Sequence, residues 1–279
     1  MKHAKRLLAL LLAAVMLFGM AAFSGAAQGK TYLVLGDSIG YGAGISNPQE
    51  ANYGRIVADT NGFIYYNNAV NGHRSVDLLR LLTSSGEVIG NVQKADIISI
   101  SIGGNDFLRG NLAGVIRDVQ NGDLSSAQAV IAALKENFNA IIERIRALNP
   151  NAVILMQTQY NPLEGKPLGD VYDVAIGMIN DMVLDEQDGR YEIVDNFSAF
   201  RGKEGLIAFD NIHPNAAGNI VIAQTVQARL YALGLADTAE ITVRVQPQDH
   251  IAGSGSFFSR VLELFQRIVD FFRKLFGVG

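Results

Sequence analysis

The sequence predicts an α/β fold, a doubly wound parallel sheet between two layers of helices. Hydrophobic runs of strand length alternate five times with amphipathic stretches of helix length. This alternation predicts right-handed crossovers between parallel strands. Most of the hydrophobic runs are nearly continuous and do not alternate with polar residues, which is typical of strands that are buried on both faces of a parallel sheet.

The individual elements follow from these runs in chain order. We expect strands at residues 32–35, 63–67, 97–102, 152–157 and 192–194. We expect helices at residues 51–59, 75–82, 125–148, 170–188 and 215–233. Asn149 and Pro150 end the longest of these helices, because the residue before a proline is disfavoured in the helical conformation.

Polar residues follow several of the predicted strands. Ser38 comes after the first strand, Asn71-Gly72-His73 after the second and Gly103-Gly104-Asn105-Asp106 after the third. Asp210 and His213 lie after the fifth strand and before the last of these helices. Ligands bind beyond the carboxyl ends of the strands in such sheets. We therefore expect these four segments to line one rim.

The first 27 residues predict a signal peptide, so we expect a secreted protein. Three basic residues precede an apolar run at 7–20, and the small residues 24–27 follow it. An uncleaved membrane anchor is the alternative, but this run is shorter than the roughly 20 residues that span a bilayer comfortably. The chain has no cysteine, which excludes lipoprotein attachment and zinc sites built from thiolates.

The remaining chain is acidic and long enough for one substantial domain, which we place at 28–236. The full chain has a net charge of −4, and loss of the three basic residues of the signal moves the charge to about −7. Because the acidic body has no basic stripe, we expect no nucleic acid partner.

Ser38, His213 and Asp210 form a candidate set for acyl transfer. A serine on a tight turn from strand to helix presents its hydroxyl outward, His213 is the candidate base, and Asp210 would orient the imidazole. The backbone N–H groups of Ser38 and Gly72 and the Asn105 amide are candidate donors to an oxyanion.

Structural interpretations of the same residues stay open. Ser38 would also serve as a helix cap, and the pair His213-Pro214 as a helix entrance with Pro214 at the first helical position. Asp37 and Asp106 are expected to bond the backbone of their turns. A single Asp/His pair has too few ligands for a metal site, so we expect no metal.

The positions of the four histidines limit the choice of base, and two segments are expected to line the pocket. His73 is the one rival base, and we expect it at the mouth of the pocket instead. His3 leaves with the signal and His250 lies in a linker. We expect the depth of the pocket to be set by the stretch 107–124 and by the loop at 159–162, which contains Tyr160.

Four blocks together resemble the SGNH hydrolases, the GDSL esterase/lipase family. They are Gly36-Asp37-Ser38, Asn68-Ala69-Val70-Asn71-Gly72, Gly103-Gly104-Asn105-Asp106 and Asp210-Asn211-Ile212-His213-Pro214. The resemblance covers residues 31 to about 233. It implies a flavodoxin-like five-stranded sheet, a triad of Ser38, His213 and Asp210, an oxyanion hole of Ser38, Gly72 and Asn105, and no cofactor. Residues 36–40 also fit the nucleophile elbow of the α/β-hydrolases, which would give the same chemistry on another fold.

The chain changes character after residue 236. Residues 241–245 alternate like a strand, and 246–256 resemble a linker, so we treat 237–256 as a strand-like segment and linker. Residues 257–279 predict an amphipathic helix whose apolar side is rich in phenylalanine. Three interpretations of residues 257–276 stay open: docking on the body, self-association, and binding to a membrane surface.

We therefore expect a secreted serine esterase or lipase that hydrolyses carboxylic esters through an acyl-enzyme. The substrate classes that remain are small esters, lipids including lysophospholipids, acetylated glycans and thioesters. A carbohydrate- or lipid-binding module with a non-productive site, tethered by its tail, is the alternative. A further alternative gives the tail the main function, as a tether.

Overall fold

The computed structural model describes residues 29–110 and 112–250. The predicted signal peptide at 1–27 and the predicted amphipathic helix at 257–279 lie outside these residues. Within the described ranges, none of the helices combines the length and the apolar character needed to cross a membrane.

The sheet has five parallel strands in the order β2-β1-β3-β4-β5, as the sequence predicts for a doubly wound fold. Each observed strand overlaps a predicted one and differs from it by at most one residue at either end. The strands are β1 (Thr31–Gly36), β2 (Ile64–Asn67), β3 (Ile97–Ser101), β4 (Val153–Gln157) and β5 (Glu192–Val194).

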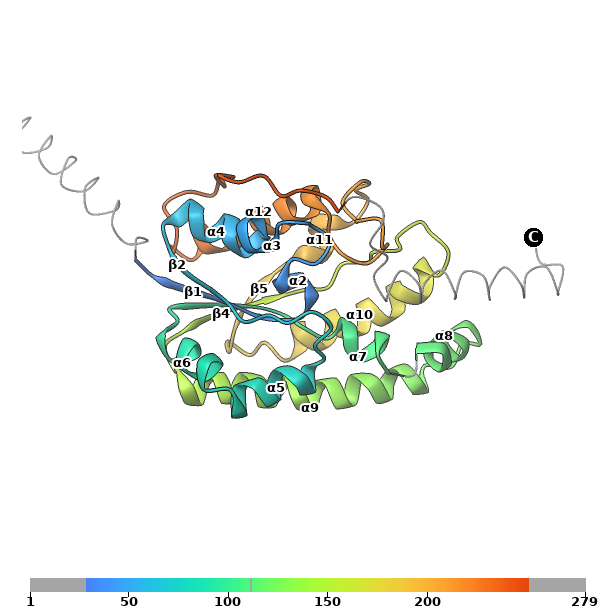
Figure 1. Ribbon diagram of the computed structural model, residues 1–279. Coiled ribbons are helices and arrows are strands. Elements are labelled where there is room, and N and C mark those ends of the chain that lie inside the picture. Colours follow the sequence, from blue (N-terminus) through green and yellow to red (C-terminus); the bar gives the residue numbers. More distant parts are fainter. Residues whose placement is uncertain (1–28, 111, 251–279) are drawn as a thin grey trace, which may run out of the picture.

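Helices cover both faces of this sheet, so the molecule has three layers (Figure 1). One layer contains α3 (Pro48–Ala51), α4 (Tyr53–Asn61), α11 (Asn196–Phe200) and α12 (Ala216–Ala232). The other contains α5 (Ser75–Ser84), α6 (Gly86–Lys94), α9 (Ser125–Leu148) and α10 (Gly169–Asp185). Three further helices lie near the carboxyl ends of the strands: α2 (Ser38–Tyr41), α7 (Gly104–Leu108) and α8 (Leu112–Gln120).

The strands supply side chains to two separate cores. Leu33 and Leu35 of β1 pack against the layer of α5 and α9, whereas Tyr32 and Val34 pack against the layer of α4 and α12. All four are fully buried. Burial of one such side chain contributes about 1.5–3 kcal/mol, so a sheet covered on both faces is held firmly. This rigidity fixes the ends of the strands, where the candidate site lies.

Two of the helices that the sequence analysis did not predict are α6 and α8. Helix α6 completes the layer that contains α5 and α9, and α8 lies at one end of the molecule (Figure 1). Helix α6 begins after Ser85, whose hydroxyl accepts a hydrogen bond from the Val88 N–H at 3.4 Å. Two glycines in α6 lower its intrinsic helix propensity, which hides its amphipathic pattern. Helix α8 packs against α9 and α10.

The strand predicted at 241–245 is absent. Ile241 and Val243 alternate as they would in a strand, but they pack against the core beneath α4 and α12. The Thr242 N–H donates to the Thr60 hydroxyl at 2.9 Å. The segment therefore lies on a helical layer, and it adds no strand to the sheet.

Candidate active site

The loop after β1 places Ser38 at the first position of helix α2. Gly36 has a φ of +117°, and a Cβ there would lie 1.9 Å from the carbonyl oxygen of Ser101. Only glycine fits this close approach of β1 to β3. The helix is capped by Asp37, whose carboxylate accepts from the Ile39 N–H at 3.0 Å. The cap of α2 is therefore Asp37, and Ser38 is left for another role.

Asp37 is a structural residue of the turn, as expected from the sequence. It is buried, and its Oδ1 also accepts from the Ser101 hydroxyl at 3.2 Å. Burial raises the pKa of this carboxyl to about 7, although hydrogen bonds from Ile39 and Ser101 and the nearby His213 oppose the rise. The carboxyl therefore holds its proton more firmly in the folded protein than an exposed aspartate does.

This raised pKa predicts a dependence of stability on pH. The unfolded chain loses the Asp37 proton near its ordinary pKa of 3.8, and the folded protein keeps that proton up to about pH 7. The contribution to stability is therefore complete below pH 3.8 and is lost as the pH rises through 7. Asp37→Asn removes the titrating group. Between pH 5 and pH 8 the unfolding free energy of this variant, measured by urea denaturation, should fall less than that of the wild type, and the difference should be at most about 3 kcal/mol.

The exposed carboxylate of Asp181 on α10 provides the matched control. Asp181→Asn changes the same charge at the surface, so its pH dependence should follow that of the wild type. If Asp37→Asn and wild type lose the same free energy over this pH interval, the buried carboxyl does not titrate as described.

His213 and Asp210 form a buried pair in the loop before α12. The Nδ1 of His213 lies 2.6 Å from Oδ2 of Asp210, and the two residues are 4 % and 5 % exposed. The other carboxylate oxygen, Oδ1, accepts from the backbone N–H groups of Ile212 and His213, each at 3.0 Å. Both oxygens of Asp210 are thus used, and the imidazole is held in one orientation.

The electrostatics of the pair favour an ionised aspartate. Burial acts to raise the pKa of Asp210, but the hydrogen bond and charge of His213 and the two backbone N–H groups outweigh it and hold this pKa below the ordinary value. A carboxylate in contact with Nδ1 favours the tautomer with its proton on Nδ1, which leaves Nε2 as the basic atom.

Residues around the pair fix the loop in place. Tyr160 donates its hydroxyl to the Ile212 carbonyl at 2.9 Å and stacks on Phe200 with ring centroids 4.3 Å apart. Helix α12 begins at Ala216 behind the cap Asn215, whose side chain accepts from the Gly218 N–H. Pro214 therefore lies outside the helix, and its interpretation as the first helical residue is wrong.

The loops after β2 and β3 are joined to each other. The Asn105 side chain of α7 donates to the His73 carbonyl at 3.0 Å, and Arg109 donates to the Gly72 carbonyl at 2.6 Å. Asp106 accepts from the N–H and the hydroxyl of Ser75 at 3.0 and 2.6 Å. Asp106 thus bonds the first residue of α5, where the sequence analysis expected a bond to the backbone of its own turn.

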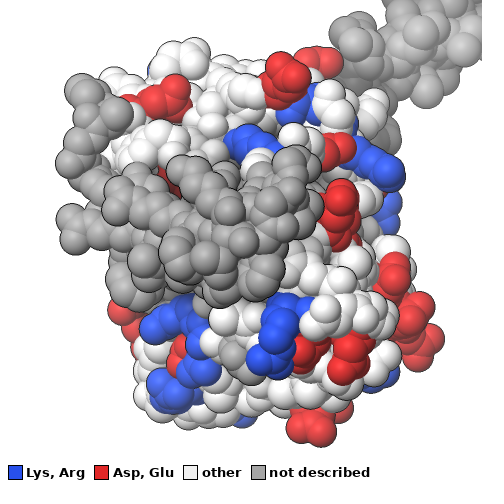
Figure 2. Space-filling model, turned by 90° about the vertical axis from the view of Figure 1, so that its right-hand side faces the viewer, with Lys and Arg blue, Asp and Glu red and all other residues white. Residues whose placement is uncertain are grey.

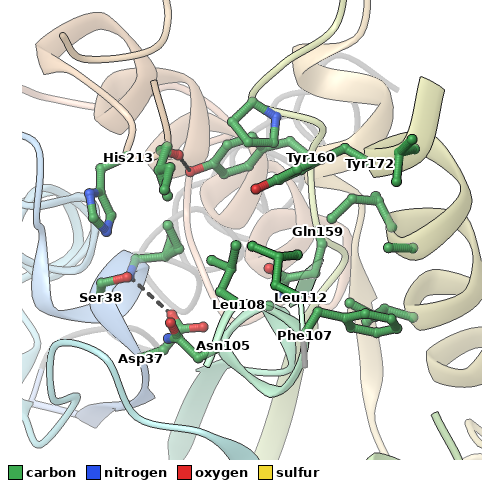
Figure 3. Close-up of a pocket in the computed structure, with 18 of the residues that line it drawn as sticks. Asp37, Ser38, Asn105, Phe107, Leu108, Leu112, Gln159, Tyr160, Tyr172 and His213 are labelled. Atoms are coloured by element: carbon green, nitrogen blue, oxygen red, sulfur yellow. Dashed lines mark hydrogen bonds between the residues drawn. The ribbon is translucent and has the colours of Figure 1, made fainter. Parts of the chain in front are cut away.

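An apolar cavity opens at Ser38, and we name it the first cavity. Figure 3 shows Ser38, Asn105 and His213 toward one end of it, with Phe107, Leu112 and Tyr172 extending away from them. The walls come from α7, α8 and α10 and from the chain near Tyr160. Its apolar lining consists of Ile39, Phe107, Leu108, Leu112, Val115, Ile116, Tyr160, Pro162, Val171, Tyr172, Ala175, Ile176, Ile179 and Ile212.

The structure brings most of the predicted site residues together. Ser38, Asn105, Tyr160 and His213 line the first cavity, and Asp210 supports His213 from behind. Gly72 is buried, has a φ of +80°, and lies one residue before the carbonyl that Asn105 binds.

His73 is placed differently from the expectation. It does not line the first cavity, nor a second cavity that lies on the other side of His213. Burial lowers the pKa of the His73 ring. The mouth position expected for this residue is therefore not seen.

The stretch 107–124 lines the cavity, as expected from the sequence, but the helix α8 within it was not predicted, and neither was the contribution of α10 to the cavity wall. The apolar residues Leu112, Val115 and Ile116 follow helical spacing, which is the signal that would have revealed α8. Among the described residues, no group of three or more His, Asp or Glu side chains could hold a metal ion.

Charged side chains of both signs are interspersed over the part of the surface visible in Figure 2. The charged residues described there form no continuous patch of one sign.

Comparison with known proteins decides between the two hydrolase folds that the sequence suggested. The model of the GDSL-like lipase/acylhydrolase family matches residues 34–220, which include Ser38, Asn105, Asp210 and His213. The chain belongs to this family. This GDSL-family hydrolase therefore does not carry the nucleophile elbow of the α/β-hydrolases, and its serine follows the first strand of the sheet.

Relatives of this GDSL-family hydrolase include bacterial proteins. The chain is 27 % identical to the uncharacterized protein YpmR of Bacillus subtilis over 225 residues, which cover 74 % of this chain and 84 % of YpmR. It is 24 % identical to the spore germination lipase LipC of Bacillus licheniformis over 212 residues, covering 72 % of this chain and 96 % of LipC.

A solved structure shares the fold of this GDSL-family hydrolase. The lipase Lip_vut3 from a goat rumen metagenome matches with a TM-score of 0.61 and 21 % identity, over 72 % of this chain and 98 % of that lipase. This likeness concerns the fold, and the family match makes the protein a lipase- or esterase-like member of the family.

Proposed function

We propose that this protein is a serine ester hydrolase with Ser38 as nucleophile, His213 as base and Asp210 as the residue that orients the base. The observation that carries the proposal is the buried contact of 2.6 Å between Asp210 and His213, at the cavity that Ser38 also lines. A binding module would need neither a base nor an acid to orient it.

Acylation begins when Nε2 of His213 takes the proton of the Ser38 hydroxyl. The Ser38 oxygen attacks the ester carbonyl carbon, and the negative charge moves to the carbonyl oxygen. The donors for that oxygen are the backbone N–H groups of Ser38 and Gly72 and the Asn105 amide. An amide group has two N–H hydrogens, so its bond to the His73 carbonyl leaves the second for the substrate.

The carbon–oxygen bond to the alcohol then breaks, and the alcohol oxygen takes the proton from His213, which completes acylation. Deacylation repeats these steps with water. Water then loses a proton to His213 and attacks the acyl carbon, and the carboxylic acid leaves when Ser38 regains its proton. The reaction consumes one water for each ester and needs no cofactor.

The Asn105 amide should act mainly in the transition state. Asn105→Ala is expected to lower kcat by about 10²- to 10³-fold with little change in KM, because the oxyanion forms only during reaction. Steady-state kinetics on a p-nitrophenyl ester measure both constants.

Asn137→Ala is the matched control for this substitution. Asn137 donates to the Ser75 hydroxyl at 3.0 Å in the same network, but it does not line the first cavity. A loss of kcat as large in Asn137→Ala as in Asn105→Ala would mean that the network, and not the oxyanion contact, is responsible.

The first cavity supports an apolar acyl group as the substrate portion bound beside Ser38. Its walls are aliphatic and aromatic, and removal of each methylene from water stabilises binding by about 0.8 kcal/mol. We therefore propose that kcat/KM for p-nitrophenyl esters rises from acetyl to acyl chains of medium length.

Ala175→Phe tests whether the first cavity holds the acyl chain of the substrate. Ala175 on α10 lines the first cavity, so a phenyl group there should shorten the preferred acyl chain and lower kcat/KM for the octanoyl ester at least about tenfold relative to the acetyl ester. Ala133→Phe on the exposed side of α9 adds the same group at the surface and should keep the wild-type profile. An unchanged profile in Ala175→Phe would place the acyl chain elsewhere.

We also propose that the protein is exported. A basic start, an apolar run and small residues at positions 2–27 support this proposal. Mass spectrometry of protein from the culture medium should find a chain that lacks residues 1–27, and an intact N-terminus would contradict the proposal.

A further inference from the structure

A second cavity lies beside the candidate active site. His213 lines both this cavity and the first one, so the imidazole stands between the two. The walls come from the loop after α2, from Asn71 in the loop after β2, and from the loop before α12. The hydrogen-bonding side chains of the lining belong to Tyr41, Ser46, Asn71, Asp210, His213 and His250.

The loop after α2 packs directly against the catalytic candidate His213. Gly44 has a φ of +106°, and a Cβ there would lie 2.3 Å from the Pro214 carbonyl oxygen and 2.9 Å from the Cβ of His213. No larger residue fits between the loop and the histidine. The loop that carries Gly44 therefore lines the second cavity and packs against His213.

Residues 246–250, which we name the C-terminal strap, hold the outer wall of the second cavity. The Ser46 N–H donates to the Gln248 carbonyl at 2.7 Å. The Asn47 side chain donates to the Gln246 carbonyl at 3.1 Å and accepts from the Gln248 N–H at 2.9 Å. This part of the segment that the sequence analysis assigned to a linker is thus bonded to the body.

The end of the strap reaches the cavity itself. Asp249 accepts from the Ala216 N–H at 2.7 Å, at the start of α12. His250 follows and meets Phe209 edge to face, with ring centroids 6.4 Å apart. The strap thus fixes His250 at the rim, where its imidazole can contact a bound molecule.

The lining of the second cavity combines apolar side chains with hydrogen-bonding groups, and among the residues described it contains no lysine or arginine. Hydroxyls from Tyr41 and Ser46, the Asn71 amide and the His250 imidazole can donate and accept hydrogen bonds. The one carboxylate, Asp210, is already paired with His213. A phosphate group would meet this carboxylate without a lysine or arginine to pair with, whereas a neutral polyol would find partners for its hydroxyls.

We propose that the second cavity binds the alcohol portion of the ester and selects a neutral polyol, as found in acylglycerols and acylated sugars. The inference rests on the proposed function and names the substrate class of the same site. The ester bond would lie at Ser38, with the acyl chain in the first cavity and the alcohol in the second. When the carbon–oxygen bond breaks, its electron pair stays on the alcohol oxygen, which takes the proton that His213 holds between the two cavities.

A set of octanoyl esters with different alcohols tests this assignment. The full chain would be assayed with methyl octanoate, 1-octanoylglycerol, 6-O-octanoylglucose and octanoyl lysophosphatidylcholine, by release of octanoate. We expect kcat/KM for at least one polyol ester to exceed that for the methyl ester by about tenfold or more, which corresponds to one or two hydrogen bonds. The glycerol and glucose esters distinguish the two sources of polyol.

Ala43→Leu and Asn71→Ala test the cavity directly. A leucine side chain at position 43 would occupy space in the second cavity, and loss of the exposed Asn71 amide removes a hydrogen-bonding group without a change in packing. Each is expected to lower the ratio of kcat/KM for the polyol ester to that for the methyl ester about five- to tenfold. Ala175→Phe, which narrows the first cavity, should change the acyl-chain profile and leave this ratio within about twofold of the wild type.

The outcomes separate this inference from the proposed function. Equal kcat/KM for the methyl and polyol esters, preference for the lysophospholipid, or an unchanged ratio in both Ala43→Leu and Asn71→Ala would overturn the polyol site while ester hydrolysis by Ser38 stands. Absence of hydrolysis of all these esters and of p-nitrophenyl esters by the full chain would overturn the proposed function itself.

Discussion

Ser38→Ala is expected to lower kcat on a p-nitrophenyl ester by about 10⁴- to 10⁶-fold, because no other group can form the acyl-enzyme. The residual rate should come from binding and from the oxyanion donors alone. Ser38 lies behind the cap Asp37 at the start of α2, so its hydroxyl is not needed to begin the helix. The variant should keep the unfolding temperature of the wild type within a few degrees, as measured by circular dichroism.

Ser198→Ala is the matched control for the loss of one hydroxyl. Ser198 lies on α11 and does not line the first cavity, so its kcat should stay within about twofold of the wild type. A Ser38→Ala variant that is folded and retains more than a tenth of the wild-type kcat would remove Ser38 from the mechanism.

Asp210→Asn is expected to lower kcat by about 10³- to 10⁴-fold at neutral pH. The Asn oxygen would still accept from the N–H groups of Ile212 and His213, which should keep the loop in place. The Asn NH₂ group would then face Nδ1, and because two donors repel, the imidazole would carry its proton on Nε2. In this tautomer Nε2 cannot take the proton of Ser38.

Asp37→Asn provides the matched comparison, because it changes another buried aspartate next to the nucleophile. Asp37 bonds only the turn and Ser101, so its replacement should cost far less kcat than Asp210→Asn. Equal losses of kcat in the two variants would mean that His213 does not depend on Asp210 for its tautomer.

The residues that form the sheet and the paired catalytic candidates were readable from the sequence because their signals are local. Strands such as β1 are nearly continuous apolar runs, and Asp210 lies three residues before His213, close enough for one turn to join them. The strand-end rule then placed Ser38 and Asn105 on the same rim as this pair, and both line one cavity in the structure.

The remaining features depend on tertiary contacts. The alternation of Ile241 and Val243 predicts a strand, but these side chains pack on a helical layer instead. His73 follows Gly72 in the sequence, yet only its carbonyl participates in the site, through Asn105. The strap at 246–250 is bonded through Asn47, about 200 residues earlier in the chain, which no local pattern reveals.

Labelling with a fluorophosphonate tests the central claim most directly. Such a reagent reacts with a serine only when a base activates its hydroxyl, and it forms a stable bond from the serine oxygen to phosphorus as fluoride leaves. The account predicts one adduct per chain, located on Ser38 by peptide mass spectrometry, absent from Ser38→Ala and formed far more slowly in Asp210→Asn. An adduct on another residue, or continued ester hydrolysis by a chain in which Ser38 is fully labelled, would contradict it.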